Sequence, residues 1–465
     1  MSGIRVMKFG GTSLQDADRI RRAAEVVSDA ARPVVVLSAM GGVTNLLDDA
    51  AGRAEAGDAS YTELLRQIEE RHLQAAESLA DTADRETVAR EVRQLLAELG
   101  DVLHGVELVR ECSPRTRDFV LSFGERLSCG LFTHHLNSRG VGAEYLDARD
   151  VFVSDDRHGN AAVDFDETKL RLEERVAGMA GIPVITGFLA ATREGVTTTL
   201  GRNGSDYTAS VVAAALQGDV IEIWTDVEGV MSADPRYVPE AFVLREISFQ
   251  EAMELSYFGA KVIHPYTMIP AVEHGIPVRI RNTFNPEAEG TWIVAEREES
   301  GPRVATGIAS VENVALINVE GGGMIGLPGV ASKVFTALAH AGVNIIMISQ
   351  ASSEHSICVV CRQEQASSAL AALRVELETE LTSKKIQRFE LVEDLEIVAV
   401  IGERMRGTPG ISARVFGALG EEQINVLAIA QGSSEMNISF VVHGADRERT
   451  LRTVHRAFFD TAGSE

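Results

Sequence analysis

The sequence predicts an α/β protein in which a large domain with a central, mainly parallel sheet and helices on both faces is followed by two small ferredoxin-like βαββαβ domains. Two observations predict this organisation. Over the first 300 residues, short β-branched runs alternate with helical patterns, which is typical of a parallel sheet. Beyond residue 300, one block of sequence occurs twice.

The large domain, residues 1–300, is predicted from a regular series of elements. A long stretch at 45–137 consists of helix-forming residues, with breaks or caps at Ser60, Asp81 and Ser113. The other expected elements, in order, are strand 4–9, helix 16–31, strand 33–37, strand 184–186, helix 207–216, strand 220–225 and strand 278–280. This series predicts one parallel-sheet domain that carries a helical insertion.

The repeat aligns without a gap at a fixed offset of 81 residues. Each copy runs strand, Gly/Pro turn, helix, strand, polar turn, strand and helix, which is a βαββαβ unit. We therefore expect domains at 301–390 and 391–465, with a strand near 303–309 that completes the second sheet. The pairs that align include Gly329 with Gly410, Asn344 with Asn425, and Gln350 with Gln431.

Charge and composition exclude several classes of partner. The chain has 44 basic and 68 acidic residues, a formal charge of −24 that repels polyanions and argues against nucleic-acid or anionic-membrane binding. No apolar run reaches the roughly 18 residues of a membrane-spanning helix, and the chain enters a strand without a signal peptide, so a cytoplasmic protein is expected. Only six cations are lysines, which fits either a coding bias or adaptation to high salt.

The cysteine and histidine patterns predict no protein-bound metal. Four cysteines fit a reducing compartment. Cys358 and Cys361 form a CxxC, but they lie in a strand-like run in which residues three apart point to opposite faces. The histidines show no paired metal-ligand spacing.

Three glycine-rich segments have residues suited to anion binding. KFGGTS at 8–13 follows a strand, where backbone N–H groups and Lys8 favour a phosphate, although an ordinary tight turn is the alternative. SAMGGVT at 38–44 follows the next strand, so both loops are expected at the carboxyl edge of the sheet. In GRNGSD at 201–206, Arg202 can clamp a carboxylate and Asp206 can pair with Lys8.

Two later segments add candidates for nucleotide binding. Thr225 and Asp226 close a strand and open a loop that ends at Arg236, a pattern that fits either a nucleotide-binding edge or an ordinary turn. FGAKV at 258–262 places Lys261 in an apolar, Gly-flanked setting that is unusual for a surface lysine.

Five segments together resemble the aspartate kinases, which combine the amino-acid kinase fold with paired ACT regulatory domains. They are KFGGTS at 8–13, FGER at 123–126, GRNGSD at 201–206, TDV at 225–227 and FGAKVIHP at 258–265, in the family's order. The resemblance implies transfer of the ATP γ-phosphoryl group to the β-carboxylate of L-aspartate. The product would be 4-phospho-L-aspartate, the first intermediate of lysine, threonine and methionine biosynthesis.

The resemblance also implies residue roles, with Arg202 on the substrate α-carboxylate, Glu125 on its ammonium and Asp206 organising Lys8. Mg²⁺ is expected to arrive with ATP, without a prosthetic group. The implied catalytic residues are Lys8, Asp206 and Lys261. The implied aspartate-binding residues are Ser38, Thr44, Glu125, Arg202 and Ser205. The implied nucleotide-binding residues are Lys8, Gly10, Gly11, Ser13, Thr225, Asp226, Met231, Arg236, Lys261 and Val262, where Met231 replaces a tyrosine common in relatives.

The polar turns of the repeat, SQASSE at 349–354 and AQGSSE at 430–435, are most similar to those of the threonine-sensitive members, including the aspartokinase–homoserine dehydrogenases. Threonine is thus the favoured effector and lysine its rival, and the alternative is that these turns merely cap strands. Because the sequence ends at Glu465, we expect a monofunctional enzyme, with a homodimer or higher homo-oligomer through the ACT domains. The candidate effector-binding residues are Asn344, Gln350, Asn425 and Gln431.

Two other functions stay open at this point. One is a kinase for another amino acid such as glutamate, which the repeat and the segment 258–265 disfavour. The other is an amino-acid sensor that has kept the fold and lost catalysis, which the presence of Lys8, Arg202, Asp206 and Lys261 disfavours.

Overall fold

The computed structural model describes residues 3–81, 84–259, 265–297, 303–324, 328–350 and 355–460. The chain divides into two compact units. The first contains the chain up to Val230, the segment Val243–Phe249 and a stretch that ends at Arg297. The second contains the C-terminal part of the chain, the segment Met231–Phe242 and a stretch that begins at Gln250. The predicted fold class is confirmed, and the domain limits at 300 and 390 stay predictions.

The first unit is built on an eight-stranded sheet in the order β3-β4-β2-β1-β7-β9-β10-β8. All neighbouring strands are parallel except β9 and β10. The runs predicted at 33–37 and 220–225 form strands with those limits. The strands are β1 (Arg5–Phe9), β2 (Pro33–Leu37), β3 (Ala143–Leu146), β4 (Ile182–Thr186), β7 (Val220–Thr225), β8 (Glu246–Ser248), β9 (Val278–Asn282) and β10 (Thr291–Val294), with a separate hairpin of β5 (Leu189–Ala191) and β6 (Thr197–Thr199).

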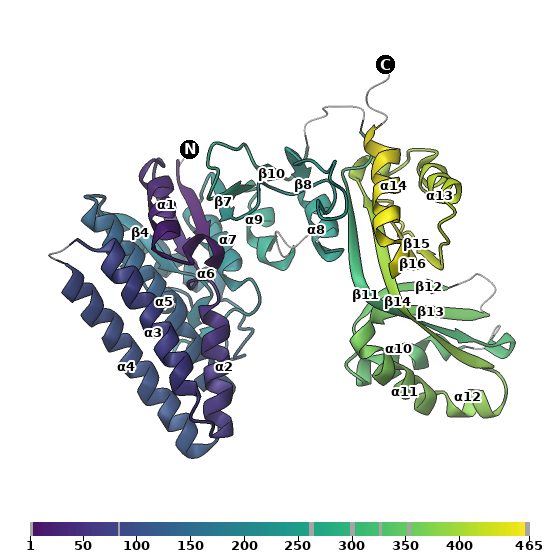
Figure 1. Ribbon diagram of the computed structural model, residues 1–465, viewed down its shortest axis with the longest axis horizontal. Coiled ribbons are helices and arrows are strands. Elements are labelled where there is room, and N and C mark those ends of the chain that lie inside the picture. The colour runs from purple at the N-terminus through teal and green to yellow at the C-terminus, as the bar shows by residue number, and fades with distance from the viewer. Residues whose placement is uncertain are drawn as a thin grey trace. The chain divides into compact units, whose positions relative to one another are not determined.

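The helical insertion is present as predicted, and its four helices lie side by side (Figure 1). The predicted breaks at Ser60, Asp81 and Ser113 all fall between helices, and the Ser113 hydroxyl caps the last of them by accepting from the Thr116 N–H. The helices of the first unit are α1 (Ala17–Ser28), α2 (Val43–Ala56), α3 (Tyr61–Leu79), α4 (Arg85–Val109), α5 (Pro114–Ser138), α6 (Phe165–Ala177), α7 (Gly204–Leu216) and α9 (Ile269–Glu273). Helix α8 (Phe249–Tyr257) belongs to the second unit except for its first residue.

Two helices on opposite faces of the sheet come close to the end of β1. Successive strand residues point to opposite faces of the sheet, so the side chains of Lys8 and Phe9 lie on opposite faces. The Phe9 ring stacks on Trp224, with ring centroids 5.9 Å apart, and lies 6.3 Å from Phe132 of α5. On the other face, Lys8 reaches Asp206 of α7. The carboxyl end of β1 therefore lies between α5 and α7.

The second unit contains one six-stranded antiparallel sheet, in the order β12-β13-β11-β14-β16-β15, which both repeats share. Its two longest strands, β11 and β14, each contribute to both repeats, and Gly307–Val311 pairs with Ile397–Ile401. Near the middle of each long strand one residue has a positive φ, Asn313 at 57° and Asp394 at 56°, and these positions align in the repeat. The strands are β11 (Gly307–Glu320), β12 (Ile345–Gln350), β13 (Ser356–Arg362), β14 (Arg388–Ile401), β15 (Ala428–Ala430) and β16 (Asn437–His443).

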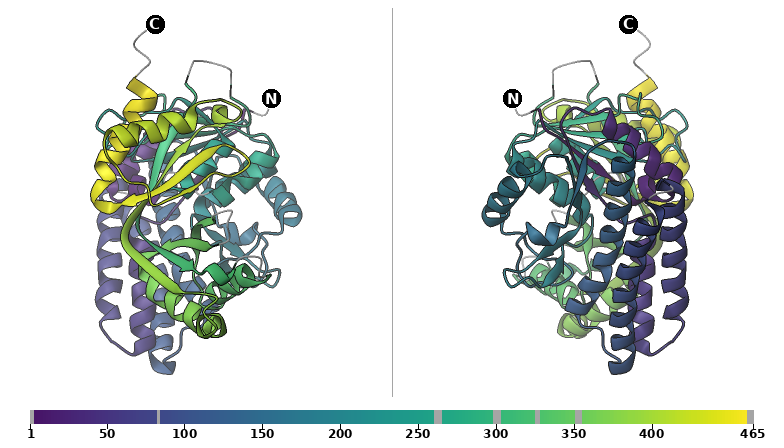
Figure 2. Two further views of the ribbon diagram at one scale, coloured as in Figure 1. Left: turned by 90° about the vertical axis from the view of Figure 1, so that its right-hand side faces the viewer. Right: turned by 90° about the vertical axis from the view of Figure 1, so that its left-hand side faces the viewer.

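The helices of the two repeats form two groups at the two ends of the long strands (Figures 1 and 2). Each group covers its own apolar cluster, one around Val334 and Leu373 and the other around Val415 and Phe440. The strand predicted at 303–309 begins only at Gly307. The helices are α10 (Val330–His340), α11 (Ala366–Glu376) and α12 (Glu378–Thr382) in one group, and α13 (Ile411–Glu421) and α14 (Arg447–Phe459) in the other.

Candidate active site

The two glycine-rich turns predicted to bind anions lie against each other. They follow β1 and β2, which are neighbouring parallel strands, so both turns are at the carboxyl edge of the sheet. A Cβ atom on Gly41 would lie 2.9 Å from the Gly11 carbonyl oxygen, and one on Gly11 would lie 3.1 Å from the Ala39 oxygen. The close approach of the two turns therefore requires glycine at these positions.

The predicted ion pair between Lys8 and Asp206 is present at this edge. Lys8 Nζ lies 2.5 Å from Asp206 Oδ1, and the two side chains are only 11% and 9% exposed. Asp206 is in the first turn of α7, which begins after Asn203 in the left-handed conformation. Asp206 therefore holds the Lys8 ammonium group in place where the two glycine-rich turns meet.

Hydroxyl groups from three elements lie next to this pair. Ser38 Oγ donates to Ser205 Oγ at 2.9 Å, which joins the end of β2 to the start of α7. Ser128 Oγ of α5 donates to the Ser38 carbonyl at 2.7 Å. These contacts fix Ser38 and Ser205 beside the ion pair.

Glu125 of α5 is the most perturbed carboxyl group of the site. It is 3% exposed, and Oε1 accepts the Ala39 N–H at 3.1 Å. Its other oxygen, Oε2, is buried without a hydrogen-bond partner among the described residues. Burial raises the pKa of Glu125 to about 8, from a usual value of 4.5, because the charged form loses its hydration. A cation next to Oε2 would restore the charged form.

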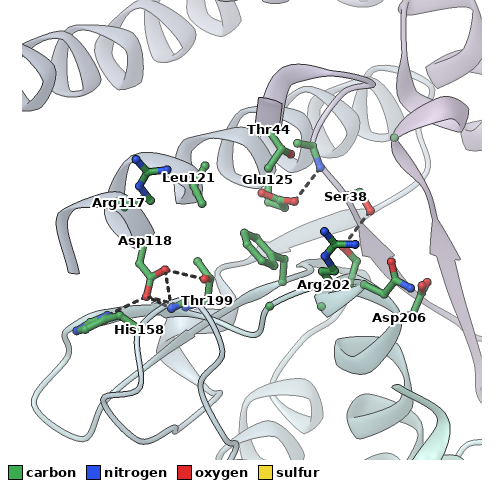
Figure 3. Close-up of a pocket in the computed structure, with 18 of the residues that line it drawn as sticks. Ser38, Thr44, Arg117, Asp118, Leu121, Glu125, His158, Thr199, Arg202 and Asp206 are labelled. Atoms are coloured by element: carbon green, nitrogen blue, oxygen red, sulfur yellow. Dashed lines mark hydrogen bonds and ion pairs between the residues drawn. The ribbon is translucent and has the colours of Figure 1, made fainter. Parts of the chain in front are cut away.

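These residues line one pocket of about 660 Å³ (Figure 3). Arg202 is exposed at this pocket and forms no ion pair within the described part of the chain, so its guanidinium is available for a carboxylate. The pocket thus combines the Lys8–Asp206 ion pair, the available guanidinium of Arg202 and one buried Glu125 oxygen without a hydrogen-bond partner among the described residues. The predicted site residues that it brings together are Lys8, Gly11, Ser38, Thr44, Glu125, Arg202, Ser205 and Asp206.

Comparison with protein families assigns both parts of the chain. Residues 3–282 match the amino acid kinase family, and residues 317–377 and 398–458 each match an ACT domain. Aspartokinase 2 of Arabidopsis thaliana, a chloroplastic protein, is 35% identical over 98% of this chain and 84% of its own length. The chain belongs to the aspartokinase family.

Longer relatives and solved structures extend this comparison. Bifunctional aspartokinase/homoserine dehydrogenase 1 of A. thaliana is 40% identical over 98% of this chain and 51% of its own length, so the chain spans about half of that relative. Two crystal structures of Escherichia coli aspartokinase III, each 34% identical, match 98% of this chain and 100% of theirs. The complex with aspartate and ADP (R-state) has a TM-score of 0.80, and the complex with lysine and aspartate (T-state) has 0.81.

The predicted nucleotide-binding residues of this aspartokinase family member are less concentrated than the predicted aspartate-binding residues. Gly10 donates its N–H to the Trp224 carbonyl, and the Ser13 hydroxyl is buried against Trp224 and Thr283, 2.8 Å from Thr283 Oγ1. The Ser13 backbone N–H also donates, to the Gly10 carbonyl at 3.0 Å, so both the side chain and the N–H of Ser13 are engaged within the protein.

The other predicted nucleotide-binding residues that the structure describes do not line the 660 Å³ pocket. Thr225 ends β7 and Asp226 follows it, next to β1 at the same edge of the sheet. Met231 and Arg236 belong to the second unit, where Arg236 Nη2 lies 2.6 Å from Asp234 Oδ2. Lys261 and Val262 lie outside the described residues, and all of these assignments stay predictions.

The pocket also contains residues that the sequence did not predict. Thr199 of β6 forms a hydrogen bond with Asp118 of α5 in the wall of the pocket, and His158 forms a second one with Asp118 (Figure 3). Phe188 and Arg117 line it as well. Only Asp118 had a sequence signal, because it precedes Glu125 by seven residues on one predicted helix and so lies on the same face.

Of the predicted effector residues, Gln431 lines a pocket of about 710 Å³ together with Ser433 and Glu435. Asn425, Asn344 and Gln350 are exposed and outside the lining of that pocket. The polar turn that follows Gln350, residues 351–354, lies outside the described residues.

The described residues contain neither a cluster of metal-ligating side chains nor a membrane-spanning helix. No group of three or more His, Cys, Asp or Glu side chains there could hold a metal ion. No helix in the described ranges combines the length and apolar character needed to cross a bilayer.

Proposed function

We propose that this chain transfers the γ-phosphoryl group of MgATP to the β-carboxylate of L-aspartate, giving 4-phospho-L-aspartate. The observation that carries the proposal is the pocket in which the buried Lys8–Asp206 pair, the available Arg202 and the partnerless Glu125 oxygen meet. Membership of the aspartokinase family supports it, as does the match to E. coli aspartokinase III with aspartate and ADP.

The charges of the pocket complement those of an amino dicarboxylate. Glu125 Oε2 can accept from the substrate ammonium, which replaces the hydration that burial removed. Arg202 can bind the α-carboxylate through two parallel hydrogen bonds. With both ends of the amino-acid backbone held, the β-carboxylate is directed to the remaining positive charge, Lys8.

The chemical step needs positioning more than proton transfer. A carboxylate is already ionised at pH 7, so no general base is required. The protein has to align the nucleophile with the γ-phosphorus and neutralise the charge that develops on the phosphoryl oxygens. Lys8, held in place by Asp206, is suited to that task, and the N–H group of Gly11 can face the phosphates.

The nucleotide would extend from the phosphates toward the loop after β7. Thr225 and Asp226 at the sheet edge, with Met231, Arg236, Lys261 and Val262, are the residues we propose to contact it. Mg²⁺ would enter as part of MgATP, held by phosphate oxygens and water, as is usual for this cation.

The decisive experiment measures ADP release with MgATP and L-aspartate, with L-glutamate as the competing substrate. We expect turnover with aspartate, and none with aspartate would overturn the proposal. Turnover with glutamate at least equal to that with aspartate would instead indicate another amino-acid kinase. Binding of amino acids without any turnover would indicate a sensor.

The variant Lys8→Ala tests whether turnover depends on the pocket. Removing a charge aimed at the transferred group typically costs about 10²–10³-fold in turnover. Lys169→Ala is the matched control, because Lys169 is a partly exposed lysine of α6 that does not line the pocket. Wild-type turnover in Lys8→Ala would reject the assigned role.

We further propose feedback inhibition by an amino acid through the ACT domains, with threonine first and lysine second, in lysine, threonine and methionine biosynthesis. The turns around Gln350 and Gln431 support threonine, whereas lysine is bound in the T-state E. coli structure. Inhibition curves with threonine, lysine and methionine test this. A homodimer or larger homo-oligomer through these domains is proposed with it, and the molar mass in solution tests that part.

A further inference from the structure

Asp118 is a buried carboxylate in the wall of the proposed aspartate pocket, and no role is assigned to it by the motifs. It is 1% exposed. Its Oδ1 accepts from Thr199 Oγ1 at 2.6 Å, and its Oδ2 accepts from the Thr199 N–H at 3.2 Å and lies 2.8 Å from His158 Nδ1. The Gly159 N–H also donates to both oxygens, with its nitrogen 3.1 Å from each. The carboxylate therefore ties α5 to two other segments at once.

Both of these segments are connected to Arg202, one along the chain and one through packing. Thr199 ends β6, three residues before Arg202 in the chain. Gly159 is packed on the turn between them, because a Cβ atom on Gly201 would lie 3.1 Å from the Gly159 oxygen and 2.7 Å from Asn160 Oδ1. Asp118 thus holds the loop at 158–160 and the end of β6 in fixed positions. These two segments in turn fix the backbone position from which the Arg202 side chain extends.

Helix α5 also carries Glu125, the residue proposed to contact the substrate ammonium. Glu125 follows Asp118 by seven residues on α5, which is about two helical turns, so both side chains lie on one face. A single rigid helix therefore carries the residue proposed to bind the ammonium and the residue that anchors the segment of Arg202.

We propose that Asp118 is a positioning residue that sets the separation of Arg202 from Glu125, and through it selects an amino dicarboxylate of the length of aspartate. The inference rests on the proposed function. The ammonium and the α-carboxylate share one carbon atom, so these two contacts fix where that carbon lies. A fixed α-carbon and a fixed Lys8 leave room for one chain length, and the γ-carboxylate of glutamate would overshoot the position of the β-carboxylate.

Asp118→Asn tests this with the least change of shape. Every contact of Asp118 comes from a donor, and an asparagine replaces one accepting oxygen by an NH₂ group that faces donors. We expect about a tenfold higher dissociation constant and KM for aspartate, KM for ATP within about twofold of wild type, and about a tenfold loss of preference for aspartate over glutamate.

Two further variants separate positioning from general damage. Thr199→Val removes the hydroxyl contact alone and keeps the backbone contact, so it should shift the same quantities by a smaller factor, whereas Thr199→Ser should restore them. Glu222→Gln is the matched control, because Glu222 is also 1% exposed and bonded, to Arg5 and Trp224, yet does not line the pocket. It should lower thermal stability and leave the aspartate preference unchanged.

Calorimetric binding of L-aspartate, measured beside turnover, distinguishes the two ways of failing. If the wild-type chain neither binds nor phosphorylates aspartate, the proposed function fails and this inference fails with it. If the wild type is active and both Asp118→Asn and Thr199→Val keep its aspartate affinity and its aspartate/glutamate ratio, the function stands and the positioning role is wrong. An equal loss of affinity and selectivity in Glu222→Gln would also overturn it.

Discussion

Asp118 and Glu125 lie on one face of α5, and both carboxyl groups are almost fully buried, yet their surroundings are opposite. Asp118 is contacted by donors from Thr199, Gly159 and His158 on both of its oxygens. Glu125 accepts one N–H, from Ala39, and its second oxygen has no partner among the described residues. The same helix therefore carries one carboxylate that is complete within the protein and one that is not.

The difference separates a structural role from a binding role. Leaving a polar atom buried without a partner costs about 1–3 kcal/mol, so a fold tolerates it where a ligand supplies the missing contact. Asp118 shows that this region of α5 can satisfy a carboxylate with protein donors alone. The incomplete environment of Glu125 is thus specific to its position in the pocket, beside Lys8 and Arg202.

Glu125→Gln should give the largest effect on substrate binding. Glutamine keeps the shape and the contact with Ala39 but cannot supply a negative charge to the substrate ammonium. Because a charged hydrogen bond contributes about 1.5–3 kcal/mol, we expect KM for aspartate to rise roughly 10- to 100-fold, with KM for ATP little changed, in steady-state assays. An unchanged KM for aspartate would show that Glu125 does not contact the substrate.

The pH dependence of wild-type kcat/KM for aspartate should report the same group. The pKa of Glu125 is raised to about 8 by burial, so in the free enzyme the charged form that binds an ammonium increases as pH rises. We expect kcat/KM to rise roughly tenfold between pH 7 and pH 9, and the rise to disappear in Glu125→Gln. Asp118→Asn should lower the whole profile and keep its shape. A profile with the same rise in Glu125→Gln would assign the titration to another group.

The parts of this molecule that are predictable from sequence are those that depend on local pattern. The strands at 33–37 and 220–225 could be located because continuous β-branched runs are typical of a buried parallel strand. The helical insertion was predictable because Ser60 and Ser113 are the kind of residue that begins a helix. Two separate small sheets were the natural expectation for the repeat, and a shared sheet with two long strands depends on pairing that the pattern does not contain.

The candidate site likewise has one part that local sequence pattern predicts and another part that it does not. Lys8 and Ser38 could be predicted together because they lie at the carboxyl ends of neighbouring parallel strands, which meet at one edge of the sheet, whereas Asp206 lies in the first turn of α7. The cluster of Asp118, His158 and Thr199 joins positions 40 and 81 residues apart through hydrogen bonds, and no local spacing encodes that. The assignment of Met231 and Arg236 to the second unit likewise depends on tertiary contacts.

The substitutions Glu125→Gln and Asp118→Asn should change the thermal stability of the protein in opposite directions. The folded pKa of Glu125 lies above its unfolded value of 4.5, so its stabilising contribution is fully present below about pH 4.5 and is lost as pH rises to about 8. Each pH unit in this window costs about 1.4 kcal/mol. Glu125→Gln should therefore gain stability over wild type from pH 5 to pH 8, whereas Asp118→Asn should melt at a lower temperature.

Scanning calorimetry or fluorescence melting from pH 5 to pH 9 measures both effects. A difference between Glu125→Gln and wild type that does not grow with pH would contradict the raised pKa. An Asp118→Asn protein as stable as wild type would show that its donors find other partners.

Gln431→Ala should have the smallest effect on the uninhibited enzyme. Gln431 lines the 710 Å³ pocket of the second unit, and that pocket shares no residue with the one that contains Glu125 and Asp118. Feedback requires that the effector bind two states of the protein with different affinities, so losing an effector contact weakens inhibition without changing the chemistry. We expect kcat and both KM values within about twofold of wild type and a threonine inhibition curve shifted to higher concentration, with Gln350→Ala as the equivalent change in the first repeat. If both variants keep the parent curve for threonine and for lysine, these glutamines do not bind the effector.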